Sequence, residues 1–336
     1  MKKRKLGSTG LEVSIIGFGG IPLQRLKEAE ALEVVKYAIN QGINFIDTAR
    51  GYTVSEGYIG KAIEASRDQL ILATKSPVRD YEGMKEALEE SFKDLKTDYI
   101  DLYQFHFVRY KADLEKIMSE DGAYKALSEA KAAGKIGHIG ITGHSADLML
   151  EAINLEKFET IQFPFNIVED QGTELFKRAK ELNMGTIVMK PIAGGAISEG
   201  ELSLKYILNK EFIDAAIPGM DTKEIIDKNI NVGKNLTPLS IDEFNKIDAI
   251  AKTLGEDFCR RCGYCLPCPQ GIDIPTQFIF EAYLNKYQIP DWANERYASL
   301  SVNASDCIEC GQCENKCPYN LPIIDMLKKV DQAFSE

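Results

Sequence analysis

The fold class that this 336-residue sequence predicts is α/β: a (β/α)8 barrel, the TIM barrel, followed by a small and mostly α-helical domain. Two observations predict it. From residue 13 to residue 235 the chain repeats one plan eight times, a short apolar run followed by a turn and an amphipathic stretch. All eight cysteines come after this region, between residues 259 and 317. The sequence therefore divides into a barrel and a cysteine-rich end.

The eight apolar runs are the predicted strands of the barrel. They are nearly continuous in Val, Ile, Leu and Phe, as in parallel strands that are covered on both faces. In chain order they are VSIIGFG at 13, INFIDTA at 43, LILATKS at 70, YIDLYQFH at 99, HIGITG at 138, TIQFPFN at 160, TIVMKP at 186 and IDAAIPG at 213. Between them, one-sided stripes such as Leu32, Val35 and Ile39 indicate helices. Eight such units are the number in a closed barrel, and a doubly wound open sheet is the alternative.

Further elements flank the repeated region. Residues 2–13 contain two glycines and predict a hairpin before the first strand. Residues 240–254 begin with a Ser-Ile-Asp-Glu capping box and predict a helix that leaves the barrel. The composition changes after this helix. We therefore expect a barrel domain at 1–255 and a cysteine-containing domain at 256–336.

Composition and charge limit the classes of partner. With 44% apolar and 27% charged residues, the chain can bury a full core and is expected to be globular. Its net charge of -11 repels phosphate backbones, so we expect no nucleic-acid partner. The basic first residues lack a following apolar segment, and no run of about 18 apolar residues occurs. We expect no membrane partner and a cytoplasmic location, where thiols stay reduced.

Polar side chains close three neighbouring apolar runs, at the end where a barrel carries its chemistry. Asp47 ends the second run, Lys75 the third and His106 the fourth, and Tyr52 lies in the loop after the second. Singly each is ordinary, since a strand-end lysine usually reaches water. Together, the lysine is expected to lower the tyrosine pKa from about 10, and the carboxylate to keep that lysine charged. Tyr52 could then donate a proton to a carbonyl oxygen that His106 holds by a hydrogen bond.

Five stretches, in their order and spacing, resemble the aldo-keto reductases over residues 3 to 250. They are LGSTGLEVSIIGFGG, NFIDTARGYTVSEGYIGKAI, LILATKS, DLYQFH and IPGMDTKEIIDKN. The resemblance implies a (β/α)8 barrel that binds a nicotinamide coenzyme, NAD(P)H, without a Rossmann domain. It also implies a catalytic tetrad of Asp47, Tyr52, Lys75 and His106, in which Tyr52 is the general acid and base. The implied substrate is a small carbonyl compound or alcohol.

The same resemblance implies a set of coenzyme contacts. Gln162 matches the family's contact to the nicotinamide amide, and Asn229 also matches. The Gly-rich strand ends at 191–195 and 217–220 fall where barrels hold phosphate, after the seventh and eighth strands. The residues expected to contact the coenzyme are Gly20, Asp47, Thr142, Gln162, Met189, Pro191, Gly194, Gly195, Pro218, Gly219 and Asn229.

Several positions depart from the family's pattern. Thr142 stands at the first position of the family's usual Ser-Asn pair, and Met189 stands where the family usually has a stacking tyrosine. Gly219 and Ile225 stand where members that prefer NADPH usually carry a lysine and an arginine, and Asp221 adds a negative charge to that loop. We therefore expect NADH to be used at least as well as NADPH, although the lysine two residues after Asp221 could reach a 2′-phosphate.

The cysteines form two runs with the spacing of iron-sulfur proteins. The later run has the C-x2-C-x2-C-x3-C-P spacing of bacterial ferredoxins, and its members are Cys307, Cys310, Cys313 and Cys317. The earlier run has one residue fewer before its last cysteine, and its members are Cys259, Cys262, Cys265 and Cys268. In ferredoxins the fourth cysteine of each run binds the other cluster. Pairing by this rule predicts two [4Fe-4S] clusters, each held by three cysteines of one run and the last of the other.

Two alternatives to the clusters are a four-thiolate zinc site and disulfides. Two complete runs, each ending in Cys-Pro, exceed what zinc needs, and disulfides do not suit a reducing compartment. The 38 residues between the runs contain the only tryptophan, Trp292, and predict helices that pack this ferredoxin-like domain on the barrel. The whole chain resembles those aldo-keto reductases that end in such a domain.

The sequence leaves the role of the clusters open. A nicotinamide delivers two electrons together as hydride, whereas a cluster takes one at a time, so exchange needs a mediator such as a flavin. A barrel can bind a flavin phosphate without a sequence fingerprint, and none is present here. Besides a reductase, the chain could be an electron-transfer protein whose barrel binds a flavin or a redox partner protein, or a regulatory coenzyme sensor. The clusters could also simply hold the C-terminal segment together.

Overall fold

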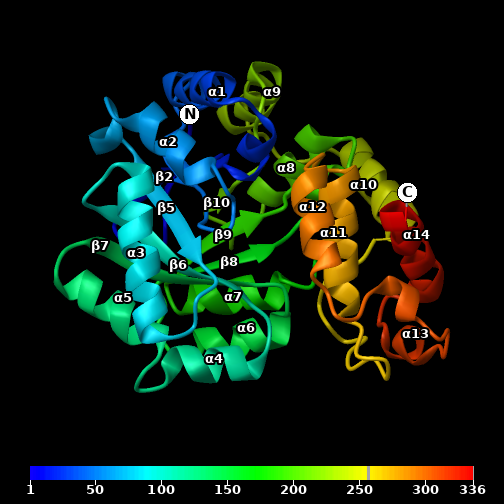
Figure 1. Ribbon diagram of the computed structural model, residues 1–336. Coiled ribbons are helices and arrows are strands. Elements are labelled where there is room, and N and C mark those ends of the chain that lie inside the picture. Colours follow the sequence, from blue (N-terminus) through cyan, green and yellow to red (C-terminus); the bar gives the residue numbers. More distant parts are fainter. Residues whose placement is uncertain (256–257, 336) are drawn as a thin grey trace.

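A computed structural model describes residues 1–255 and 258–335, and its largest part is a barrel of eight parallel strands (Figure 1). The strands follow one another around the barrel in chain order. They are β3 (Phe18–Gly19), β4 (Phe45–Asp47), β5 (Ile71–Ser76), β6 (Ile100–Val108), β7 (Ile136–Gly143), β8 (Thr160–Pro164), β9 (Gly185–Met189) and β10 (Ala215–Ala216). The sheet is closed, because Gly17 N donates to the Ala216 carbonyl at 2.8 Å and Gly19 N to the Pro218 carbonyl at 3.0 Å. The predicted barrel is confirmed, and the open sheet is ruled out.

The first predicted strand is divided between two structures. Its beginning belongs to β2 (Glu12–Ser14), which pairs antiparallel with β1 (Lys3–Lys5) in the predicted hairpin, and only its end enters the barrel as β3. Leu6 and Val13 are fully buried in an apolar cluster with the inward side chains of the strands, including Phe45. The hairpin therefore packs against the interior of the barrel.

Helices follow the strands and cover the outside of the barrel. They are α1 (Glu28–Asn40), α2 (Ser55–Ile63), α3 (Tyr81–Leu95), α4 (Lys111–Met118), α5 (Ala123–Ala132), α6 (Ala146–Ile153), α7 (Thr173–Glu181), α8 (Gly200–Leu208) and α9 (Lys223–Lys234), with short 3-10 turns η1 (Ile21–Arg25), η2 (Arg67–Gln69) and η3 (Ala193–Gly195). Their apolar faces and the outer faces of the strands form the main core. The strands are thus covered on both faces, as their continuous apolar sequences require.

Beyond the barrel, α10 (Ile241–Leu254) is the predicted outgoing helix, and it begins at the predicted capping box. The Ser240 hydroxyl accepts a hydrogen bond from Glu243 N at 3.2 Å, and the Glu243 carboxylate accepts one from Ser240 N at 2.7 Å. The predicted domain boundary after residue 255 falls at residues 256 and 257, which lie outside the described residues. It therefore stays a prediction.

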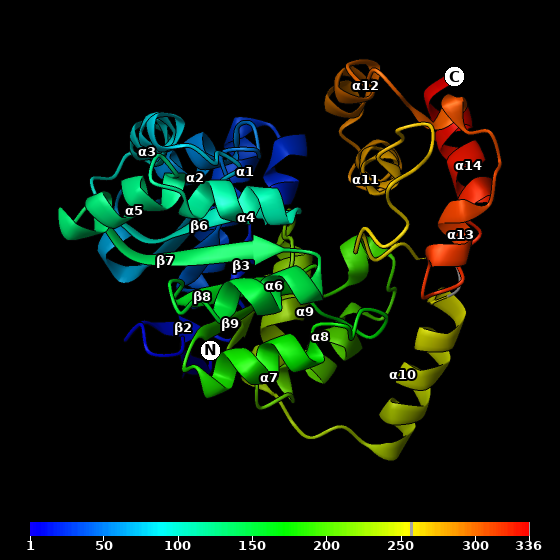
Figure 2. The same ribbon diagram turned by 90° about the horizontal axis from the view of Figure 1, so that it is seen from below.

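The C-terminal part is mostly helical and has its own apolar core around the cysteines. Its elements are α11 (Ile274–Asn285), α12 (Pro290–Ala298), η4 (Ala304–Asp306), α13 (Gln312–Lys316) and α14 (Ile323–Ser335). In Figure 2 the arrow of β7 points towards α11, so this part faces the carboxyl ends of the barrel strands. In the described part of the chain, no helix combines the length and the hydropathy needed to cross a lipid bilayer.

Charged side chains join the C-terminal part to the barrel loops. Arg109, just after β6, makes two hydrogen bonds of 2.7 Å to the carboxylate of Asp273, which directly precedes α11. Arg260 donates to the carbonyl of Val168 at 3.1 Å, in the loop after β8. Such bidentate and buried contacts fix geometry, so α11 is held over the mouth of the barrel.

Candidate active site

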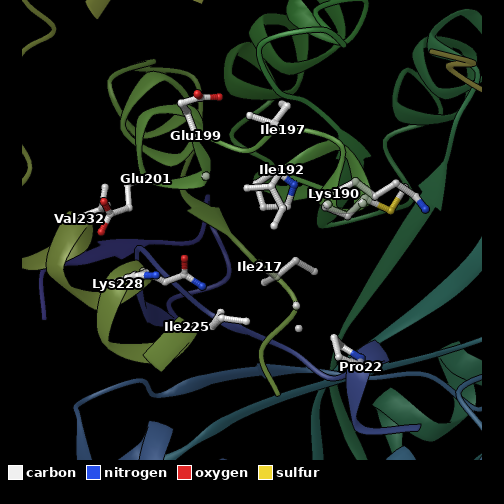
Figure 3. A pocket seen from close by; sticks show the side chains of 18 of the residues that line it. Pro22, Lys190, Ile192, Ile197, Glu199, Glu201, Ile217, Ile225, Lys228 and Val232 are labelled. Atoms are coloured by element: carbon white, nitrogen blue, oxygen red, sulfur yellow. The ribbon is translucent and has the colours of Figure 1, made fainter. Parts of the chain in front are cut away.

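A cavity of about 810 Å³ opens at the carboxyl end of the barrel, which is the end where barrels carry their chemistry. Its walls come from the loops after β3, β4, β9 and β10, from α8 and α9, and from the segment after α11. In Figure 3, Lys190 and Pro22 lie at one side of this pocket and Lys228 and Glu201 at the other. Several barrel loops and the C-terminal domain therefore contribute residues to the wall of one pocket.

A buried ion pair lies beneath the pocket. The Lys75 ammonium, fully buried in β5, donates to the Asp47 carboxylate at 2.5 Å and to the Thr48 carbonyl at 2.7 Å. Gln104 donates to the other Asp47 oxygen at 3.2 Å. Burial raises the pKa of Asp47 and lowers that of Lys75, while each partner opposes the shift of the other. The pair holds the lysine next to the loop that carries Tyr52.

Tyr52 lines the pocket, and both predicted partners contact its ring. The Lys75 Nζ lies 5.2 Å from the ring centroid, and the His106 ring meets it edge-on at 5.7 Å between centroids. The structure therefore brings the four residues predicted from the strand ends to one place. Lys75 contacts the face of the ring, and its hydrogen bonds go to Asp47 and Thr48.

The expected lowering of the Tyr52 pKa is corrected by the structure. Burial raises this pKa well above its usual value, and the nearby Asp47 carboxylate and the tyrosines 283 and 287 raise it further. Lys75 does not reverse the shift because its charge is already matched by Asp47. Burial, together with the charge of Lys75, lowers the pKa of His106 well below its usual value. Tyr52 is therefore a neutral phenol and His106 a neutral imidazole around pH 7.

Two amide side chains in the pocket each leave one polar atom without a hydrogen-bond partner. The side-chain oxygen of Gln162, in the middle of β8, and the side-chain nitrogen of Asn229, in α9, are both buried and unpaired within the described residues. Buried polar groups are rarely left without a partner, and the exceptions often mark a ligand site. The amide group of a nicotinamide coenzyme could donate to the Gln162 oxygen, and an acceptor atom of one of its polar rings could receive the Asn229 nitrogen's hydrogen bond. The donor set of the pocket therefore fits such a coenzyme.

Most of the predicted coenzyme contacts line this pocket, and two do not. Those that line it are Gly20, Asp47, Gln162, Met189, Pro191, Gly194, Gly195, Gly219 and Asn229. Thr142 instead packs inside the sheet, where its hydroxyl accepts a hydrogen bond from Phe107 N at 2.9 Å. Pro218 uses its carbonyl to close the barrel to Gly19. Both residues contact the barrel backbone, and their contacts to a coenzyme stay predictions.

Sequence reasoning missed three side chains of the pocket wall. Arg25, in η1, forms an ion pair with Asp221 in the loop after β10. Lys190 directly follows β9, and as a polar residue closing an apolar run it met the criterion used for Lys75. Tyr287 comes from the C-terminal domain, where the sequence carries no signal that it faces the barrel.

The eight cysteines line two further small cavities. One is lined by Cys259, Cys262, Cys265 and Cys317. The other is lined by Cys268, Cys307, Cys310 and Cys313. This division is the one that the ferredoxin rule predicts, with the last cysteine of each run in the other set. Four thiols around one cavity are the ligand set of a [4Fe-4S] cluster, so the residues present fit two such clusters.

The spacing of these thiols bears on the zinc alternative. Within residues 1–255 and 258–335, no three His, Cys, Asp or Glu side chains lie close enough to hold one metal ion. A zinc ion needs its ligands about 2.3 Å from a single centre, whereas the ligands of a cubane are spread around a larger body. Four cysteines at one cavity are a ligand set that both a [4Fe-4S] cluster and a four-thiolate zinc site use, so metal analysis must decide between them.

Comparisons with known proteins agree with this fold and site. The sequence model "Aldo/keto reductase family" matches residues 15–202, and the model "4Fe-4S dicluster domain" matches residues 258–322. These matches define an oxidoreductase that combines a barrel with an iron-sulfur domain. The chain belongs to the aldo/keto reductase family.

Individual relatives cover mainly the barrel. The uncharacterized oxidoreductase YqkF of Bacillus subtilis is 31% identical over 216 residues, which are 60% of this chain and 68% of YqkF. L-galactose dehydrogenase of Arabidopsis thaliana is 27% identical over 301 residues, 74% of this chain and 93% of that enzyme. Among solved structures, the aldo-keto reductase AKR11C1 from Bacillus halodurans in its holo form has 27% identity and a TM-score of 0.66, covering 75% of this chain and 96% of its own.

Proposed function

We propose that this protein reduces a small aldehyde or ketone with NAD(P)H, or oxidises the corresponding alcohol, and that Tyr52 is its general acid and base. The observation that carries the proposal is the pocket itself. One cavity contains Tyr52 and the two unpaired buried amides, Gln162 and Asn229. The amides suit a nicotinamide coenzyme, and the phenol suits a carbonyl substrate beside it.

The protonation states of the site support this role. A phenol whose pKa is raised stays protonated and can donate its proton to the oxygen of a carbonyl group. A neutral His106 can donate a hydrogen bond to the same oxygen and so orient it. The Lys75–Asp47 pair keeps the ring of Tyr52 in place from below. When bound, the nicotinamide supplies hydride to the carbonyl carbon.

For the coenzyme, we propose that the unpaired oxygen of Gln162 accepts from the nicotinamide amide and that Asn229 meets the adenosine end. The charges near Asn229 favour NADH at least as much as NADPH. Lys223 is directed to Glu33, 3.4 Å away, and does not line the pocket, while Lys228 is paired with Glu224 at 2.6 Å. A 2′-phosphate would have to compete for these paired lysines.

We also propose two [4Fe-4S] clusters, one in each four-cysteine cavity. Bound there, such clusters accept and release electrons one at a time. The residues that would hold them are the two sets Cys259, Cys262, Cys265, Cys317 and Cys268, Cys307, Cys310, Cys313. Reduced thiols are needed to bind them, which fits a cytoplasmic location.

A second candidate function is electron transfer, and the arrangement of the two cysteine sets favours it over a purely structural role. Arg261 lies between Cys259 and Cys262 in sequence and is paired with Glu169 of the barrel at 2.9 Å, so the first set adjoins the barrel mouth. Cys310 of the second set is exposed. If the barrel binds a flavin that takes up a hydride, its two electrons could pass one at a time through the clusters to a redox partner protein at the surface.

An anaerobic assay separates the two candidates. Purified protein is mixed with NADH or NADPH and a panel of uncharged aldehydes and ketones, while coenzyme absorbance and the visible cluster band are followed. Oxidation of coenzyme only when a carbonyl is present, with an unchanged cluster band, would support the reductase. Bleaching of the cluster band by coenzyme alone would support electron transfer. If the protein neither reduced any carbonyl compound nor bound either coenzyme, the proposed function would be refuted.

A further inference from the structure

The segment that follows α11 places a tyrosine of the C-terminal domain in the wall of the pocket. Tyr287 lines the cavity together with barrel residues. Its carbonyl accepts a hydrogen bond from the Arg25 guanidinium at 3.3 Å. Its ring meets the Tyr283 ring at 5.0 Å between centroids, and Tyr283 stacks on Trp292 at 4.2 Å. Both helices α11 and α12 therefore position this side chain.

The hydroxyl of Tyr287 lies over the turn that follows β9. Gly194 in this turn has a φ of +67°, and a Cβ added there would lie 2.6 Å from the Tyr287 hydroxyl oxygen. Only glycine therefore leaves room for the hydroxyl at this point. The turn after the seventh strand of a barrel is a common place for a phosphate group. A hydroxyl donor is thus held at a turn suited to an anion.

A cation without a carboxylate partner stands beside this hydroxyl. The Lys190 Nζ lies 6.0 Å from the centroid of the Tyr287 ring and lines the same pocket. Glu169, the carboxylate that acts on it, is paired with Arg261, and Lys190 forms no ion pair within the part of the chain that the structure describes. The Lys190 side chain is half-buried and burial lowers its pKa, because removing an unpaired charge from water is costly. Such a lysine in a pocket wall indicates an anionic ligand.

The electrostatics of Tyr287 agree with this indication. Burial would raise its pKa, but Lys190 and Arg261 outweigh burial and lower it. The other groups that act on the phenol are Lys286 and the nearby Tyr283. The place is therefore electropositive, and an anion bound there would restore the balance of charge.

We propose that Lys190 and the Tyr287 hydroxyl form a subsite for the pyrophosphate of the coenzyme. The iron-sulfur domain then supplies part of the coenzyme grip, and Gly194 is glycine because the hydroxyl needs its space. This inference rests on the proposed function, since it assumes that the pocket binds NAD(P)H. It assigns to the C-terminal domain a binding role that does not depend on electron transfer.

The test is the dissociation constant of NADH, measured by fluorescence titration of the anaerobic full-length protein in the absence of substrate. Loss of a charge-assisted hydrogen bond typically weakens binding about 10- to 100-fold, and loss of a neutral one about 3- to 10-fold. We expect the affinity for NADH to fall about 10- to 100-fold in Lys190→Met and about 3- to 10-fold in Tyr287→Phe. Tyr283→Phe is the matched control, because it removes a hydroxyl from the same stack outside the pocket lining, and its affinity should be unchanged.

A second measurement distinguishes coenzyme phosphate from a substrate anion. The KM for an uncharged aromatic aldehyde is compared with that for its carboxylate-bearing analogue in each variant. A loss confined to the KM of the carboxylate, with unchanged NADH affinity, would assign the subsite to substrate and overturn the proposal. Wild-type affinity for NADH in both variants, with normal iron content, would also overturn the proposal. If the wild-type protein itself binds neither coenzyme, the proposed function fails first.

Discussion

Arg25 and Asp221 form an ion pair at one side of the pocket. Arg25 belongs to η1, after the first strand of the barrel, and Asp221 to the loop after the last strand. Both side chains line the cavity, and Arg25 also donates to the Tyr287 carbonyl. Three loops that are distant in sequence are therefore joined over one side of the pocket.

Breaking this pair should speed the release of coenzyme. Arg25→Met removes both contacts of the guanidinium, and a partly exposed ion pair contributes up to about 1 kcal/mol, so we expect dissociation up to about fivefold faster. Stopped-flow displacement of bound NADH measures it. Lys223→Met is the control, since the Lys223–Glu33 pair lies outside the pocket lining. Equal rates in both variants would mean that the pair does not retain the coenzyme.

Tyr52→Phe should abolish most carbonyl reduction without weakening coenzyme binding. Loss of a general acid typically costs about 10² to 10⁴ in rate, and the ring contacts to Lys75 and His106 are kept. The control is Tyr99→Phe, at the opposite end of the barrel just before β6. Steady-state kinetics with fluorescence titration decide the matter, and undiminished turnover would exclude Tyr52 as the acid.

The pH dependence should differ between the two directions of the reaction. The Tyr52 pKa is raised and the His106 pKa is lowered, so reduction needs the protonated phenol and the neutral imidazole, which coexist over a wide range. We expect kcat/KM for reduction to stay flat from about pH 6.5 to about pH 10, the usual values of the two groups, and to fall only above that. Alcohol oxidation should rise with pH over the same range. A bell centred near neutral pH for reduction would contradict this.

Replacing Gln162 should weaken binding with little change in stability. Its buried side-chain oxygen lacks a partner, but its amide also hydrogen-bonds the Asp47 carboxylate, so in Gln162→Leu the two effects oppose each other and stability should change by no more than about 1 kcal/mol. The same change should weaken NADH binding about 3- to 10-fold. Thermal unfolding without coenzyme and fluorescence titration measure the two effects. A destabilised variant with normal affinity would show that the amide serves the fold alone.

Iron content should reveal how the cysteines are paired. The wild-type protein should contain about eight iron and eight sulfide per chain when prepared anaerobically. Cys268→Ser and Cys307→Ser should each affect one cluster, and the double variant should lose no more iron than either single one, because both line the same cavity. Combining Cys268→Ser with Cys265→Ser, from the same run but the other cavity, should affect both clusters. The opposite pattern would pair the cysteines within each run, and stoichiometric zinc would refute the clusters.

Local sequence patterns predicted the helices and strands well, because these elements depend mainly on residues that are neighbours along the chain. Continuous apolar runs identified the barrel strands, and the capping box at Ser240 identified the start of α10. The first strand was the exception. Its run reads as one apolar segment, but Val13 and Ser14 pair with β1, since a hairpin partner nearby in the chain competes for the same backbone groups.

The grouping of the candidate catalytic residues was predictable from sequence for a similar reason. A barrel brings all its strand ends to one rim, so Asp47, Lys75 and His106 could be grouped once the strands were known. The surroundings of Thr142 were not predictable, because position at a strand end does not reveal which way a side chain points. Here the bulge in β6 directs the Phe107 amide to the Thr142 hydroxyl.

By itself, then, the sequence determined the barrel, the rim that carries Tyr52 and the two runs of cysteines, since each depends on a local pattern or a fixed spacing. Only the tertiary structure decided how the domains meet. The presence of Tyr287 over Gly194 and the unmatched charge of Lys190 result from packing α11 against the barrel mouth. The raised Tyr52 pKa was also decided there, because burial and the Asp47–Lys75 pair set the field at the phenol. Those interactions join residues far apart in the chain, which no local pattern records.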